Sequence, residues 1–102
     1  MYRGTTPTIT FTLPFDSSRI TALNLCFAQQ GIVILEKDLK ACRVEKDTLR
    51  VSLTETETLL FDSKKGMVEM QLRIGCGDAR MASNIMQVSV DRILKDGCLE
   101  CI

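Results

Sequence analysis

The sequence predicts an all-β domain built from antiparallel strands. In residues 66–74, Val68, Met70, Leu72 and Ile74 fall on one side of an extended chain, and polar residues fall on the other. This repeat of two residues is typical of a strand with one buried face, because a helix would not gather these four side chains on one side. The same alternation recurs in residues 9–13, 23–27 and 49–53. We therefore expect several half-buried strands and little helix.

The first half of the chain contains the signals for five strands. Pro7 favours an extended start, Pro14 ends the first strand, and Asp16 with the two serines that follow favours a turn. Gln29, Gln30 and Gly31 form a short connection, whereas residues 37–40 are polar and predict a loop. The close spacing of the fourth and fifth strands predicts a hairpin. The five expected strands are residues 8–13, 20–28, 32–36, 41–44 and 48–53.

A single helical turn is expected near residues 54–60. Thr54 and Glu57 have the spacing of a capping box, in which each side chain bonds the backbone amide of the other residue. Leu59, Leu60 and Phe61 follow and are expected to close one end of the domain. Two further strands, residues 67–75 and 80–90, should pair around a tight turn that contains Gly75 and Gly77.

About seven short strands in some hundred residues are typical of a two-sheet β-sandwich of the immunoglobulin kind. A small barrel is the alternative architecture. The chain has no tryptophan, so the buried tryptophan of antibody domains is missing. We expect one sandwich domain over residues 1–94 and a tail over residues 95–102.

The composition argues against an enzyme. Thirteen basic residues balance thirteen acidic ones, and there is no histidine. A zero net charge gives no broad field to attract nucleic acid or an anionic membrane, and the commonest general base and metal ligand is missing. No stretch approaches the roughly twenty apolar residues of a membrane span, and no signal peptide is recognised. We expect no cofactor, no nucleic acid, no membrane, and a location in the bacterial cytoplasm before assembly, with the virion as a later location.

Two sequence motifs invite a chemical interpretation and favour a structural one. Gly75, Cys76, Gly77 and Asp78 resemble a phosphate-binding loop but lack its lysine and following helix, so a hairpin turn is expected. Glu55, Glu57 and Asp62 cluster in sequence, but Glu57 already serves the capping box. We expect no catalytic residue in either segment.

Five cysteines without a secretory signal predict free thiols in a reducing compartment. Cys98 and Cys101 form a Cys-x-x-Cys, which could bind metal with two more ligands or act in redox chemistry. A structural zinc site needs four ligands, and a thioredoxin-like motif belongs at a helix start in another fold. We expect no metal site, and keep a thiol redox or metal-binding protein as the less favoured hypothesis.

Three segments together resemble a known group of proteins. They are the threonine-rich opening at residues 3–14, the run 49–58 that ends in Thr-Glu-Thr-Glu-Thr, and residues 82–90, which end in Val-Ser-Val. They resemble small prophage proteins of Gram-positive gut bacteria, which in turn are similar to the amino-terminal immunoglobulin-like domain of phage baseplate upper proteins. The likeness covers residues 3 to about 94. It implies a tail or baseplate component that binds other proteins and catalyses no reaction.

The expected function is therefore that of a non-enzymatic phage or prophage structural or assembly protein. An open sandwich leaves strand edges with unpaired backbone groups, which can bind another chain. We predict contacts with other phage structural proteins or self-association, through the first and third strands and through Met81. A carbohydrate- or host-surface-binding module is the alternative. The chain has one tyrosine and no tryptophan, so it offers few exposed aromatic side chains on which a sugar could stack. The predicted interaction residues are Ile9, Phe11, Ile32, Ile34 and Met81.

Overall fold

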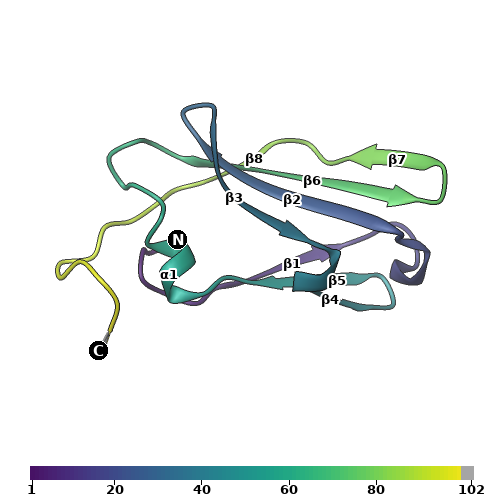
Figure 1. Cartoon of the computed structure of the whole chain (residues 1–102), viewed down its shortest axis with the longest axis horizontal. Helices are drawn as coiled ribbons and strands as arrows, with labels where there is room; N and C mark the ends of the chain where they lie inside the picture. Colours follow the sequence, from purple (N-terminus) through teal and green to yellow (C-terminus); the bar gives the residue numbers. More distant parts are fainter. Residues whose placement is uncertain (100–102) are drawn as a thin grey trace.

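The computed structural model describes residues 1–99 and confirms the all-β prediction. Two antiparallel sheets lie face to face (Figure 1). The three-stranded sheet has the order β1 (Thr8–Thr12), β5 (Thr48–Ser52), β4 (Cys42–Glu45). The five-stranded sheet has the order β3 (Ile32–Asp38), β2 (Ala22–Gln29), β6 (Val68–Cys76), β7 (Ala79–Ala82), and β8 (Met86–Val88) also pairs with β6.

This connectivity is immunoglobulin-like. Strands β1, β5 and β4 take the places of B, E and D, while β3, β2, β6 and the β7/β8 pair take those of C′, C, F and G. Within residues 1–99, no strand occupies the place of strand A beside β1. Instead, the start of the chain forms one parallel bridge between Tyr2 and Asp91, just after β8. The place of strand A beside β1 is therefore empty among these residues.

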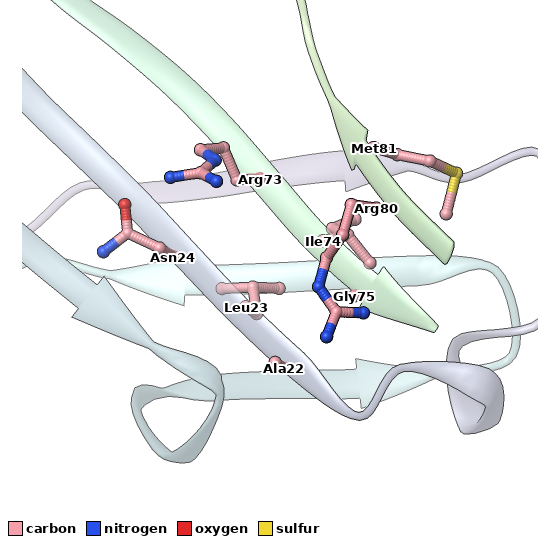
Figure 2. Close-up of a pocket in the computed structure, with 8 residues that line it drawn as sticks. All are labelled: Ala22, Leu23, Asn24, Arg73, Ile74, Gly75, Arg80 and Met81. Carbon is pink, nitrogen blue, oxygen red and sulfur yellow. The ribbon is translucent and has the colours of Figure 1, made fainter. Parts of the chain in front are cut away.

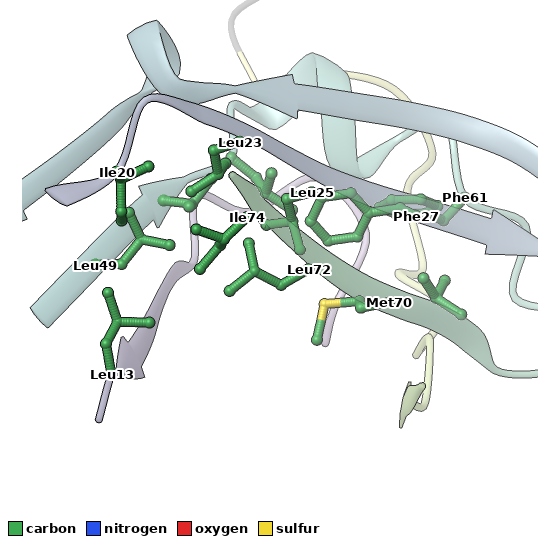
Figure 3. Close-up of a cluster of buried hydrophobic side chains, with 13 residues drawn as sticks. Leu13, Ile20, Leu23, Leu25, Phe27, Leu49, Phe61, Met70, Leu72 and Ile74 are labelled. Atoms are coloured by element: carbon green, nitrogen blue, oxygen red, sulfur yellow. The ribbon is translucent and has the colours of Figure 1, made fainter. Parts of the chain in front are cut away.

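The core lies between the inner faces of the two sheets (Figure 3). Phe27 on β2 and Phe61 are fully buried, and their ring centroids are 5.8 Å apart. Phe27 lies on the strand that carries the buried tryptophan in antibody domains. The expectation that Leu59, Leu60 and Phe61 all close one end is wrong for Leu60, which is 54% exposed. The buried apolar side chains are Leu13, Ile20, Leu23, Leu25, Phe27, Leu49, Val51, Leu53, Phe61, Val68, Met70, Leu72 and Ile74.

The last predicted strand is divided by a β-bulge. Ser83 donates its N–H to the Leu72 carbonyl, while its hydroxyl accepts the Leu72 N–H at 3.0 Å. A side chain thus replaces a backbone acceptor, and the pairing with β6 shifts by one residue between β7 and β8. The shift places Met81, opposite Ile74, on the same inner face as Met86 and Val88.

β3 contains a second bulge, and it is also longer than the sequence predicts. Phe27 pairs with Leu35 and Ala28 pairs with Val33, so Ile34 is the extra residue. The bulge inverts the alternation beyond it, and Lys37 therefore lies opposite the buried Leu25. The predicted loop at residues 37–40 is wrong, because β3 continues to Asp38 and a 3₁₀ helix spans Leu39–Ala41.

The helix α1 (Glu55–Thr58) links the two sheets, and its capping box is confirmed. The Glu57 N–H donates to Thr54 Oγ1 at 3.1 Å, and the Thr54 N–H donates to Glu57 Oε1 at 2.8 Å. The other Glu57 oxygen contacts Lys37 Nζ of β3 at 2.5 Å, with both side chains largely shielded from solvent. One carboxylate thus caps α1 and ties it to the five-stranded sheet.

Two buried polar side chains hold the loops at this end of the sandwich. The Thr58 hydroxyl accepts the Thr5 N–H at 3.1 Å and lies 2.9 and 3.0 Å from the carbonyls of Thr5 and Glu55. The Gln29 amide donates to the carbonyls of Asp62 and Gly66 and accepts the Asp62 N–H. Because every buried polar atom of both side chains has a partner, their burial costs little free energy.

Arg3 fastens the beginning of the chain to the same end. Its guanidinium donates to the carbonyls of Phe61 and Leu59 at 2.6 and 2.9 Å, and it forms an ion pair with Asp96. The Leu99 N–H donates to Glu55. Residues 95–99 of the predicted tail therefore contact the domain, and residues 100–102 lie outside the described range.

We expect Thr58→Val to lower the free energy of unfolding by about 1–3 kcal/mol, because it removes the hydroxyl of a fully buried side chain that accepts the Thr5 N–H. Thr10→Val is the matched control, since Thr10 is exposed and its side chain makes no hydrogen bond to any residue that the structure describes. Urea unfolding measures both variants. Equal stability losses for the two would contradict this role of Thr58.

Glu57 should make stability depend on pH. Burial alone would raise the pKa of its carboxyl, but hydrogen bonds from Lys37 and Thr54 outweigh burial and hold the pKa below its ordinary 4.5. A lowered folded-state pKa adds stability above pH 4.5 that is lost as the pH falls through the folded-state value. Glu57→Gln keeps the cap geometry but loses the charge, so its stability deficit should shrink in acid.

The control for this titration is Glu45→Gln. Glu45 contacts Arg50 at 3.9 Å on an exposed surface, where an ion pair contributes less than about 1 kcal/mol. Its deficit should be small at every pH. A Glu57→Gln deficit that stays constant from neutral pH into acid would show that the charge does not stabilise the fold.

Candidate functional site

The outer edge of β1 carries unpaired backbone groups. Leu13 donates to the Asp47 carbonyl and Leu53 donates to the Pro7 carbonyl, so the odd-numbered residues of this segment bond to β5. Alternation then directs the N–H and C=O groups of Thr8, Thr10 and Thr12 away from the sheet. All five residue pairs of β1 and β5 are in regular register. The edge is thus straight and open to hydrogen bonding along its length.

An apolar groove of about 270 Å³ lies beside this edge, between β1 and β7. Phe11, Leu13 and Phe15 form one wall, while Ile74 and Met81 contribute to the other. Met81 is 40% exposed, which is high for a side chain on the inner face. We call the β1 edge and this groove together the open side.

The open side unites two of the five predicted interaction residues. Phe11 and Met81, distant in sequence, line the same groove, and Ile9 is half-buried on the inner face of β1. Ile32, 63% exposed, and Ile34 lie on β3, at the edge of the other sheet. Ile9 and Phe11 were predicted from the inward alternation of the first strand. Nothing in the sequence indicated that β7, which carries Met81, lies nearby.

The two predicted contact strands have different edges. β3 is also an edge strand, but it carries the Ile34 bulge and an inward-facing lysine, Lys37. Bulges and inward charges are features that keep a strand edge from pairing with another chain. β1 has neither, so its edge is the better place for an added strand.

A second hollow of about 230 Å³ lies on the outer face of the five-stranded sheet (Figure 2). Arg80 is fixed there, because its Nη1 donates to the carbonyls of Gly77 and Ala79 at 2.6 and 2.9 Å. A Cβ at Gly75 would lie 3.1 Å from the same nitrogen, so the absence of a side chain at Gly75 leaves room for the Arg80 guanidinium. Figure 2 shows the Arg73 and Arg80 guanidinium groups directed to different parts of the face, so the two arginines do not form a single anion-binding site.

The described residues hold no cluster of three or more metal-ligating side chains. Glu57 and Asp62 serve the cap and the loop at residues 62–66, and neither faces a reactive partner. Residues 76–79 form the turn of the hairpin between β6 and β7, and the Gly77 N–H donates to Thr21 Oγ1. A strand and not a helix follows this turn. Within residues 1–99, these side chains thus serve local structure.

The cysteines differ from one another. Cys26, Cys42 and Cys76 are half-buried free thiols, whereas Cys98 is disulfide-bonded. The expectation that all the cysteines are free thiols is therefore wrong at Cys98, and Cys101 lies outside the described residues. Burial raises the pKa of Cys26 and of Cys42, with smaller contributions from the charges of Glu36 and Asp38 respectively. Both groups are mainly protonated at neutral pH, unlike an activated nucleophile.

Comparison with known proteins found no matching family model, no similar curated protein and no similar solved structure. No helix in the described part of the chain is long and apolar enough to cross a membrane.

Because of their raised pKa values, Cys26 and Cys42 should alkylate slowly near neutral pH, with rate midpoints above the ordinary 9.0. Mass spectrometry of the iodoacetamide-treated folded protein over a pH series measures each site separately. A midpoint below 9.0 at either cysteine would indicate an activated thiol and revive the redox hypothesis.

Proposed function

We propose that this protein is a non-enzymatic assembly module that binds an extended strand of a partner protein on its open side. The observation that carries the proposal is the coincidence of an unpaired, regular strand edge with an apolar groove directly beside it. Combined with the sequence resemblance, this favours a structural protein of a phage tail or baseplate as the partner.

The open side has the two components of strand addition. Main-chain groups of Thr8, Thr10 and Thr12 offer hydrogen bonds that any extended peptide can complete, whatever its sequence. Alternate side chains of that peptide would point between the sheets, into the groove beside Phe11 and Met81. The backbone would supply affinity, and the groove would select apolar side chains at alternate positions.

The test is pairwise co-expression of the tagged chain with the product of each neighbouring gene. We expect a stable complex with a particle protein. Thr10→Pro should weaken it more than about tenfold, because proline removes an outward N–H without breaking a bond to β5. Met81→Lys should weaken it similarly by placing a charge in the groove.

Two matched variants separate binding from folding. Thr10→Val changes the side chain and keeps the N–H, so it should bind as the wild type does. Val44→Lys is the control for Met81→Lys. It places the same charge at a residue that is 43% exposed on β4, at the edge of the three-stranded sheet opposite β1. The proposal fails if no neighbouring gene product binds, or if the complex tolerates both Thr10→Pro and Met81→Lys.

A further inference from the structure

The outer face of the five-stranded sheet has a flat centre. The side chains of β2 that point outward are those of Ala22, Asn24, Cys26 and Ala28, all short, and Gly75 lies beside Ala22 on β6. The side chains between them, such as Leu25 and Phe27, point into the core. Another flat surface could therefore approach β2 closely along its whole length.

Opposite charges flank this centre in one row across the sheet. Asn24 pairs with Asp38 of β3 on one side and with Arg73 of β6 on the other. Residues directly opposite one another in adjacent antiparallel strands point to the same face. The outer face thus presents a carboxylate, an amide and a guanidinium in line, with β2 in the middle.

The Arg73 guanidinium has no ion pair or hydrogen bond within residues 1–99. Asp38 accepts only the N–H of Ala41 through its side chain, and Asn24 donates to Glu36 at 3.1 Å. Two opposite charges of one row therefore remain available to a ligand that carries the complementary pair at the same spacing.

We propose that the outer face binds a second copy of this chain around a two-fold axis that runs along β2. This rotation exchanges the two sides of β2, so Arg73 of each copy lies over Asp38 of the other. Two equivalent ion pairs then flank the paired Asn24 side chains on the axis. A two-fold axis across the strands would instead place Asp38 over Asp38 and Arg73 over Arg73, which like-charge repulsion excludes.

The size of the face sets the strength of this dimer. Four strands about 4.8 Å apart and about 27 Å long give about 400 Å² of sheet per copy. The two copies together would bury about 800 Å², less than the roughly 1,200–2,000 Å² of standard specific interfaces, so the dimer should be weak, form reversibly and depend on concentration. Its charges are near the surface, so added salt should weaken it.

Sedimentation equilibrium on the full chain tests the proposal through a charge exchange. Arg73→Asp alone places two carboxylates together at each contact, and Asp38→Arg alone places two guanidinium groups together. Each variant should raise the dimer dissociation constant more than about tenfold. An equimolar mixture of the two variants restores both ion pairs and should form heterodimers with wild-type affinity.

Two controls exclude other causes. Asp38→Asn keeps an oxygen for the Ala41 N–H but removes the charge, so it should weaken the dimer while the thermal midpoint stays unchanged. Thr10→Pro alters the open side and should leave self-association intact, which separates this inference from the proposed function. A strictly monomeric wild type, single variants that dimerise normally, or a mixture that stays monomeric would each overturn the proposal.

Discussion

The antiparallel pairing of β2 with β6 organises both the core and the outer surface of the sandwich. These are the two longest strands, and their inner faces supply Leu25, Phe27, Met70 and Leu72 to the core. Burying each such side chain contributes about 1.5–3 kcal/mol. Because successive side chains alternate between faces, the large apolar residues needed inside leave the short residues of β2 outside. The flat outer face is thus a consequence of how the core is packed.

The unequal widths of the two sheets explain the open side. The three-stranded sheet is narrower than the five-stranded sheet that it packs against. Its edge strand β1 lies beside the groove that residues of β7 also line. Of the two strands that the sequence predicts to make contacts, only β1 has an edge in regular register, since β3 is bulged at Ile34. The same sequence thus closes one edge and leaves the other available. The open side and the outer face are separate surfaces, so one chain could bind a partner and a second copy at once.

The sequence predicted what depends on local pattern and missed what depends on distant contacts. Alternation identified the strands, and the capping box of Thr54 and Glu57 was recognised because both partners lie within four residues. The bulge at Ser83 was missed because a side-chain hydroxyl takes over a backbone bond there, which leaves no compositional signal. The groove that joins Phe11 to Met81 depends on which sheet edges face each other, and periodicity does not contain that information.

Amide hydrogen exchange along β1, followed by NMR in the isolated protein, tests the central claim that this edge is unpaired. We expect alternating protection, with slow exchange at Ile9 and Phe11, which bond to β5, and fast exchange at Thr8, Thr10 and Thr12. Uniformly slow exchange along all five residues would mean that the edge is already covered. That result would contradict both the open side and the function proposed for it.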